Sequence, residues 1–440
     1  MEAVAIPGEV SDLSDACLVD LLQMAPTADV LENLRDEDPE RGFGAKAQAA
    51  LLRCLRHPLV VAHPPGRPYR ERLLKLAALA AERDGLAVDD GLAEAHAEAL
   101  CEQRTSDQWC HKTFVLDVHR PPPPSRDVGT SSFSESANPE SANPPAAMYS
   151  RHPPFLITAR VSPNLFEGGT GCHEWAAGFF LAELVVSHGA ELFANKRVAE
   201  IGPGVGVAAT ALAALTFPPL KALTLLDRDN ETLTNLAANL AINGVPSTIN
   251  ARRDTCPTRV REERVAAEGH RLDARGVQYT TEDETKRKRG AALSTPTTPS
   301  LARLDWHDFD PAALASIRAD AVVAADVLYD PTNVPALLDV TAALLGRRKK
   351  KEETPGAGVD ANRGVWTDEP FALFVSAVRQ PATLALFARL AAERGFEPED
   401  VTETLGVAPG VGFRRLAEAQ RAEIRVHALR PPKVESSVIS

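Results

Sequence analysis

The stretch KRVAEIGPGVGVAATALAAL, residues 196–215, decides the fold. Its apolar first part predicts a buried strand, and its Ala- and Leu-rich last part predicts a helix. Three glycines, Gly202, Gly204 and Gly206, lie between the two, with Pro203 among them. Glycine lets the backbone turn tightly and brings N–H groups close to a ligand at the start of a helix. This order of elements indicates a site for a cofactor that contains a nucleotide.

The alternation of strands and helices continues toward the C-terminus. Further apolar segments predict strands at residues 221–229, 319–326, 370–378 and 422–429. The segments between them have helical spacing, at residues 230–245, 331–346 and 380–396. Strands that alternate with helices of this length are typical of a doubly wound, mostly parallel α/β sheet.

Two carboxylates lie where a nucleotide would bind in such a sheet. Glu200 directly precedes the glycine loop, and Asp227 ends the next strand. An acidic residue at that second position accepts hydrogen bonds from ribose hydroxyls in dinucleotide sites. These residues fit NAD and S-adenosylmethionine equally well, so both cofactors remain open at this point.

Aromatic and acidic side chains are predicted at the same edge of the sheet. Trp175 lies in a helix-forming segment before the glycine loop, and Trp306 follows a short strand. Either ring could pack against an adenine. The segment AADVLY, residues 324–329, places Asp326 and Tyr329 at the carboxyl end of a buried strand. In open α/β sheets, ligands bind at that end of the strands.

Composition also predicts how the chain is organised. Ala- and Leu-rich helical segments near the N-terminus are separated by a proline-rich stretch, residues 56–70, in which the prolines argue against helix. A Pro/Ser/Asn-rich segment follows, which lacks the apolar side chains needed for a core. We predict a helical N-terminal domain at residues 1–118 and a flexible linker at residues 119–154. A sheet domain follows at residues 155–430, with inserted loops at 255–298 and 347–368, and a tail at residues 431–440.

Charge and cysteine content argue against several classes of protein. The net charge is −12 with a sequence pI near 5.5, so we expect no direct binding to nucleic acid. The six cysteines form no C-x-x-C pair, and the histidines near Pro58 lack a third ligand at metal spacing, so we expect neither a metal nor a disulfide framework. No leader peptide and no long apolar run is recognisable. We expect a cytoplasmic, monomeric protein without a membrane anchor.

Five motifs, in order along the chain, resemble those of a known family. They are EGGTGCHEWAA (167–177), VAEIGPGVG (198–206), LTLLDRD (223–229), RLDW (303–306) and DVLY (326–329). The chain resembles the class I, seven-stranded, S-adenosylmethionine-dependent protein-lysine methyltransferases, also called methyltransferase family 16. Two further segments, residues 51–76 and 371–396, resemble the branch that methylates a lysine of translation elongation factor 2.

The resemblance implies a fold, a cofactor and roles for particular residues. It implies a seven-stranded Rossmann-like sheet, S-adenosylmethionine as cofactor and elongation factor 2 as the protein substrate. The cofactor contacts that it implies are Trp175, Glu200, Gly202, Pro203, Gly204, Gly206, Asp227, Trp306 and Ala325. Asp326 and Tyr329 then border the channel for methyl transfer. We also predict that the helical N-terminal domain recognises the protein substrate, because a lysine on a large folded protein must be selected by surfaces outside that channel.

Lysine methylation gives Asp326 and Tyr329 a chemical purpose. A lysine has a pKa of about 10.4 and must lose a proton before its nitrogen can attack a methyl group. We predict that Asp326 accepts a hydrogen bond or proton from the lysine and that Tyr329 forms an aromatic wall beside it. Two alternatives remain open: an NAD-dependent oxidoreductase, and a binding module that keeps the fold without catalysis.

Overall fold

The computed structural model describes most of the 440-residue chain. The described residues are 13, 15–35, 42–102, 109–120, 150–151, 154–162, 170–216, 218–251, 261–265, 271–272, 278–279, 297–346, 369–416 and 418–431. The predicted inserted loop 347–368 lies outside them, as do residues 121–149 and 152–153 of the predicted linker and residues 432–440 of the tail.

The described residues form a nine-stranded, mostly parallel sheet, which confirms the predicted α/β fold. In spatial order its strands are β13 (Glu397–Asp400), β15 (Ile424–Arg430), β12 (Phe371–Ala377), β11 (Ala321–Ala325), β4 (Arg197–Ile201), β5 (Ala222–Asp227), β10 (Ser300–Arg303), β6 (Ser247–Ala251) and β7 (Arg261–Val265). The strands from β12 to β6 are parallel, and β15 is antiparallel to both of its neighbours. The strand order reverses between β4 and β11, and such a switch point is where ligands bind in doubly wound sheets.

The sheet has two strands more than the seven predicted. β6 extends the edge beyond β10, and β7 pairs with β6 in antiparallel register. The prediction that residues 255–298 form only an inserted loop is therefore wrong for residues 261–265, which are β7. Arg271–Leu272 and Gln278–Tyr279 also form a short antiparallel pair. A charged sequence such as REERV has no apolar alternation, so periodicity alone does not predict an edge strand there.

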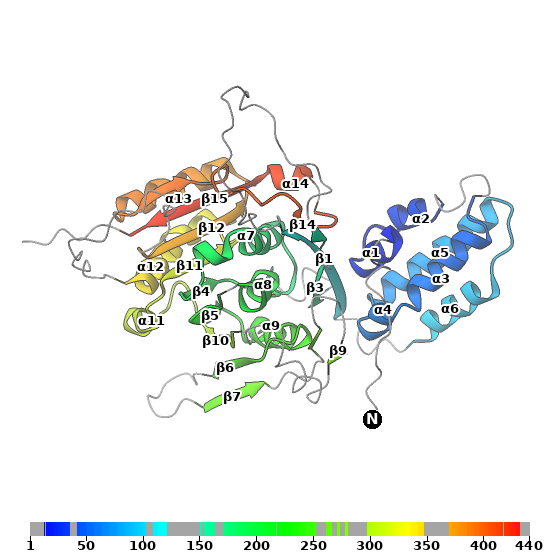
Figure 1. Cartoon of the computed structure of the whole chain (residues 1–440), viewed down its shortest axis with the longest axis horizontal. Coiled ribbons are helices and arrows are strands. Elements are labelled where there is room, and N and C mark those ends of the chain that lie inside the picture. The colour runs from blue at the N-terminus through cyan, green and yellow to red at the C-terminus, as the bar shows by residue number, and fades with distance from the viewer. Residues whose placement is uncertain are drawn as a thin grey trace, which may run out of the picture.

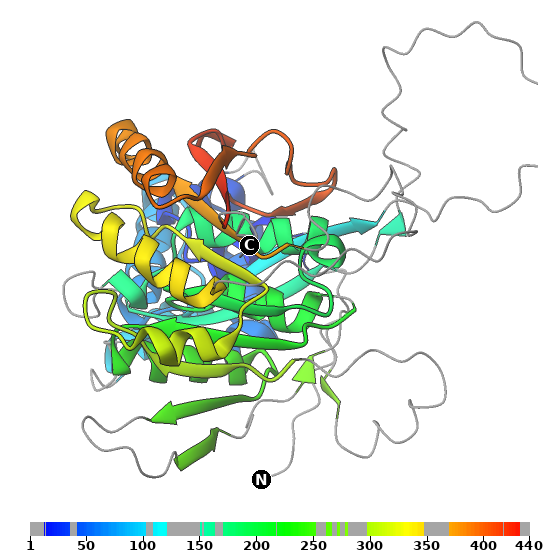
Figure 2. The same ribbon diagram turned by 90° about the vertical axis from the view of Figure 1, so that its left-hand side faces the viewer.

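Helices cover both faces of the sheet, as Figures 1 and 2 show. The helices are α7 (Ala176–Leu192), α8 (Val207–Leu215) and α9 (Asn230–Ile242) on one face, and α11 (Pro311–Ile317), α12 (Val334–Leu345) and α13 (Pro381–Glu393) on the other. Successive side chains of a strand point to opposite faces. In β4, Val198 therefore joins the core under α7 to α9, whereas Ala199 and Ile201 join the core under α11 to α13. The central strands are buried on both sides.

The N-terminal helices have a core of their own. They are α1 (Ala16–Leu22), α2 (Thr27–Arg35), α3 (Ala45–Leu55), α4 (Pro58–Ala62), α5 (Arg67–Arg83) and α6 (Asp90–Cys101). Their buried side chains, such as Leu51 and Leu73, form a cluster separate from the two cores of the sheet. Val115 belongs to the same cluster although it lies on a strand. Figure 1 shows these helices together on one side of the molecule.

A second sheet joins the helices to the rest of the chain. Its strands are β1 (Cys110–Arg120), β2 (Ser150–Arg151), β3 (Phe155–Val161) and β14 (Val411–Phe413). β1 pairs with β3 through residues 110–116 and with β14, from near the C-terminus, through residues 116–118. Residues 110–118 are therefore strand, contrary to the helical domain predicted for 1–118, and a boundary at 118 would cut through β1. The two ends of the predicted linker also pair, His119 with Arg151 and Arg120 with Ser150.

The proline-rich stretch 56–70 contains helix, contrary to prediction. Pro58 is in the first turn of α4, and Pro68 is in the first turn of α5. The first N–H groups of a helix have no partner within the helix, so a proline there removes no hydrogen bond. His57 caps α4, because its Nδ1 accepts the N–H of Leu59 at 3.3 Å. This histidine thus has a local structural role.

Candidate functional site

The glycine loop connects the carboxyl end of β4 to α8. Gly202, Gly204 and Gly206 all have positive φ angles, +67°, +55° and +86°. A Cβ on Gly206 would lie 2.4 Å from a methyl carbon of Leu236, and one on Gly204 would lie 3.3 Å from the carbonyl oxygen of Gly171. Pro203 accepts the N–H of Gly206 through its carbonyl oxygen at 2.9 Å. Only glycine combines this backbone conformation with these close approaches.

Glu200 and Asp227 form a pair of carboxylates beside this loop. Glu200 is fully buried, and its Oε2 has no hydrogen-bond partner among the described residues. Asp227 accepts the N–H of Gly204 at 3.3 Å and that of Arg228 at 2.8 Å. Burial, together with the charge of Asp227, raises the pKa of Glu200 to about 8. Burial also raises the pKa of Asp227 to about 6. An unpartnered carboxyl oxygen here suits a ligand with a cationic or hydrogen-bond donor group.

The raised pKa of Glu200 predicts a specific pH dependence of stability. The folded state keeps this proton up to about pH 8, whereas the unfolded state loses it near the ordinary value of 4.5. The contribution of Glu200 to the free energy of unfolding is therefore complete below pH 4.5. It is lost as the pH rises to about 8, by up to about 1.4 kcal/mol per pH unit. We expect Glu200→Gln to remove this decline from the free energy of unfolding, measured by urea denaturation without cofactor. Equal slopes in the native protein and the variant would contradict it.

Trp306 and Ala325 lie near the glycine loop. Trp306 follows β10, is partly buried and packs against the core under α11 to α13. Its Cζ2 lies 3.9 Å from the point that a Cβ on Gly202 would occupy. Ala325 is the last residue of β11 and is paired with Val375 of β12. The structure therefore places Trp306 close to the glycine loop, as we expected from its position after a strand.

Asp326 follows Ala325 in a strained, firmly held conformation. Its φ angle is +56°, which is unfavourable for a residue with a side chain. Its backbone N–H donates to the carbonyl oxygen of Val375 at 2.8 Å, and its Oδ1 accepts the N–H of Ala377 at 3.1 Å. Strain that is held by surrounding hydrogen bonds is common at functional sites. Tyr329, three residues later, is 47% exposed at the surface of the turn.

Arg379 is a residue of this site that the sequence analysis missed. Its Nη2 lies 3.2 Å from Oδ2 of Asp326, and its guanidinium carbon lies 5.2 Å from the centre of the Trp175 ring. Trp175 precedes α7 and is 37% exposed, and its Nε1 donates to the carbonyl oxygen of Thr170 at 3.0 Å. The signal available was a cation directly after the strand predicted at residues 370–378, at the edge of the sheet where Asp326 was expected.

Curated relatives match most of the chain. The "Protein-lysine N-methyltransferase EEF2KMT" of Bos taurus is 27% identical over 384 residues, which cover 86% of each chain. The proteins of the same name from Mus musculus and Homo sapiens are 26% and 25% identical, over 64% and 68% of this chain and 61% and 67% of theirs. The resemblance to protein-lysine methyltransferases is confirmed.

Other comparisons add little to this methyltransferase resemblance. No protein-family model matches the chain. Solved structures that align with it include the O-methyltransferase TomG from Streptomyces achromogenes, at 12% identity over 60% of this chain and 84% of that one, with a TM-score of 0.29. Cofactor-bound Rv0187 from MTB aligns at 14% identity over 61% and 85%, also with a TM-score of 0.29. TM-scores this low do not support a structural comparison, so we assign the fold from the strand order of the chain itself.

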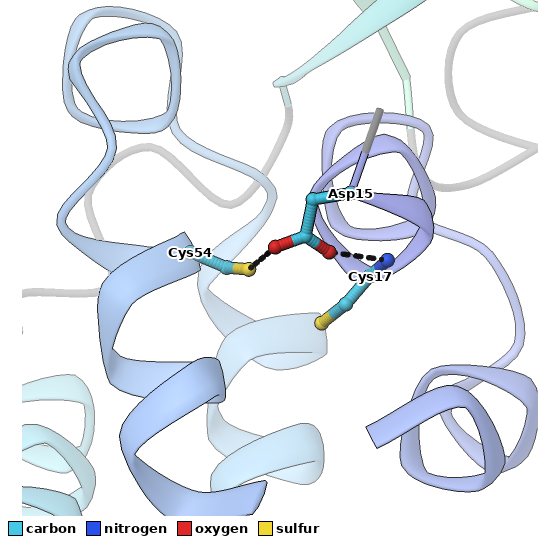
Figure 3. A group of neighbouring side chains, drawn as sticks. All are labelled: Asp15, Cys17 and Cys54. Carbon is cyan, nitrogen blue, oxygen red and sulfur yellow. Dashed lines mark hydrogen bonds between the residues drawn. The ribbon is translucent and has the colours of Figure 1, made fainter. Parts of the chain in front are cut away.

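The methyltransferase-like chain also has a cluster of Asp15, Cys17 and Cys54 in its N-terminal helices, drawn in Figure 3. The carboxylate of Asp15 is already engaged: it caps α1 by accepting the N–H of Cys17 at 2.9 Å, and it pairs with Arg53 at 3.1 Å. A hydrogen bond to Cys54 and burial raise the pKa of the Cys17 thiol, which opposes the thiolate form that metals require. These contacts give the cluster a structural role between α1 and α3.

Among the residues that the structure describes, none of the helices combines the length and the apolar character needed to cross a bilayer.

Proposed function

We propose that the chain is an S-adenosylmethionine-dependent protein-lysine N-methyltransferase and that its substrate is a lysine of translation elongation factor 2. The observation that carries the proposal is the match to EEF2KMT of Bos taurus over 86% of both chains. The carboxyl edge of the sheet supports it, because the glycine loop, Asp227 and Asp326 all lie at the switch point between β4 and β11 or beside it.

The residues at this edge fit the proposed cofactor. The unpartnered oxygen of Glu200 suits a cationic ammonium group, and Asp227 suits ribose hydroxyls. Trp306 is available to pack against the adenine, with Ala325 beside it and Trp175 at the start of α7. The closely packed glycines Gly202, Gly204 and Gly206, with Pro203 between them, allow backbone N–H groups to approach the cofactor. When bound, the cofactor supplies the methyl group.

The chain itself must present a neutral amine to that methyl group. Asp326 attracts the cationic lysine, and the ring of Tyr329 stands beside its alkyl stem. As the lysine leaves water it loses its proton more easily, because burial disfavours the charged form. Holding the nitrogen in line with the methyl carbon can lower the barrier by several kcal/mol.

The helical N-terminal part is the proposed substrate-recognition domain. A groove of about 650 Å³ lies among α3, α4, α5 and α6. Its lining combines the exposed Val61 with charges of both signs, including Arg56 and Glu94. A lysine on a large folded protein must be selected by surfaces outside the methyl-transfer channel, and this groove is such a surface.

The test is transfer of labelled methyl from S-adenosylmethionine to a lysate of cells that lack this protein. A single labelled band, identified by mass spectrometry as elongation factor 2 modified on lysine, is expected. Label on another protein would keep the enzyme class and reject the substrate. Cofactor binding without label on any protein would favour the binding module, and calorimetric binding of NAD instead of S-adenosylmethionine would favour the oxidoreductase.

A further inference from the structure

Arg379 contacts both the carboxylate of Asp326 and the ring of Trp175 at the carboxyl edge of the sheet. Its guanidinium lies between the carboxylate of Asp326, at 3.2 Å, and the face of Trp175, at 5.2 Å from its centre. A carboxylate on one side and an aromatic face on the other are the two contacts that attract an ammonium group. The site therefore already contains a cation that belongs to the chain.

The acceptor in this site is fixed and offers only one oxygen. The side chain of Asp326 is 4% exposed, and its Oδ1 is held by the N–H of Ala377 at 3.1 Å. Its Oδ2 is the atom that Arg379 contacts. A carboxylate this buried needs a cationic partner, because an unpaired buried charge is strongly destabilising. A lysine that approaches Asp326 must compete for Oδ2.

The cation in the site, by contrast, is loosely held. Arg379 lies two residues beyond the end of β12, and its side chain is 45% exposed. Ion pairs and cation–π contacts at this exposure are each weak. An incoming lysine could replace the guanidinium while Asp326 stays paired with a positive charge throughout. The exchange of one cation for another avoids the cost of an unpaired carboxylate.

We propose that Arg379 is an internal stand-in for the substrate lysine: it occupies the acceptor position in the free protein and is displaced when substrate binds. Arginine suits this role because its guanidinium stays protonated and does not act as a nucleophile at neutral pH. This inference rests on the proposed methyltransferase function. It predicts that an amine built into the chain at this position becomes a substrate.

The decisive variant is Arg379→Lys. The lysine nitrogen is the same number of bonds from Cα as the guanidinium carbon, so it reaches the same place. After loss of a proton, its lone pair attacks the methyl carbon of S-adenosylmethionine, the carbon–sulfur bond breaks with its electrons going to sulfur, and S-adenosylhomocysteine leaves. The proton passes to solvent or Asp326. The product is a methylated side chain at position 379.

The experiment incubates the full-length variant with labelled S-adenosylmethionine and maps the label by mass spectrometry. We expect a methyl group at position 379, formed with a first-order rate constant that does not depend on protein concentration, because the reaction occurs within one molecule. The matched control is Arg389→Lys, on α13, where the native side chain is 60% exposed and pairs with Glu393. No methyl is expected there. A second variant, Arg379→Gln, should lower KM for the protein substrate by up to about fivefold, because the cation that competes for Oδ2 of Asp326 is gone.

The native protein, tested in parallel on its protein substrate, separates the two levels of proposal. If it labels the substrate while position 379 of Arg379→Lys stays unmodified, the stand-in role is wrong and the proposed function stands. A higher KM together with a lower kcat in Arg379→Gln would likewise overturn the stand-in role, since Arg379 would then be assisting catalysis. If the native protein binds cofactor and labels no protein, the proposed function fails and this inference fails with it.

Discussion

Replacing Asp227 by alanine is expected to weaken binding of S-adenosylmethionine by about a hundredfold. Hydrogen bonds to a charged group contribute about 1.5–3 kcal/mol each, and every 1.4 kcal/mol is about tenfold in affinity. Asp227 is proposed to accept from the ribose hydroxyls, and it also accepts the N–H of Gly204 within the glycine loop. The substitution removes both. Isothermal titration calorimetry above pH 7, where the carboxylate is ionised, measures the loss.

A neighbouring carboxylate supplies the control for this prediction. Asp229 lies two residues further on, is exposed, and makes no side-chain capping hydrogen bond to α9. Asp229→Ala changes the net charge by the same amount and should leave the dissociation constant within about twofold, because exposed charges are screened. Asp227→Asn, which keeps an acceptor oxygen, should fall between the two. Equal affinities for Asp227→Ala and the native protein would remove Asp227 from the cofactor site.

The glycine loop and the central strands were predictable because local patterns determine them. Strands β4, β11 and β12 are buried on both faces, so they appear in the sequence as mostly apolar runs. The loop after β4 needs glycine for reasons that lie within a few residues of it. Asp227 and Asp326 end strands and so meet at one edge of the sheet. Residue order alone therefore located most of the candidate site.

The features that were missed depend on long-range contacts. By sequence position β1 falls in the helical region, yet it pairs with β3 and β14, and β14 lies about 300 residues away. The contact of Arg379 with Trp175 joins residues about 200 positions apart and carries no short motif. Pro58 was misjudged for a local reason, because proline opposes helix only beyond the first turn. Hydrophobic periodicity within one segment gives no information on contacts such as those of β1 with β14 or of Arg379 with Trp175, whose partners lie far apart in the sequence.

The largest loss of stability is expected from Glu183→Ala in α7. Glu183 is fully buried in a mostly apolar part of α7, where it accepts the N–H of Phe413 at 2.7 Å and pairs with both terminal nitrogens of Arg421. These contacts fasten β14 and α14 (Glu418–Ala422) to the sheet domain. Removing one partner of a buried ion pair costs about 3–5 kcal/mol. Against a typical total of about 5–15 kcal/mol, this loss should show plainly in urea denaturation.

Matched variants separate the buried pair from a general effect of altering α7. Glu191 lies on the same helix and is exposed, so Glu191→Ala should change the free energy of unfolding by less than about 0.5 kcal/mol. Glu183→Gln keeps an oxygen for Phe413 and should lose less than Glu183→Ala. Arg421→Ala leaves Glu183 charged and buried without its cation, whereas Glu183→Leu combined with Arg421→Leu leaves no unpaired charge. Recovery of stability in this double variant, relative to either single change, is expected from the pairing. Additive losses in the double variant would instead mean that the two side chains act independently, and that β14 is held by packing alone.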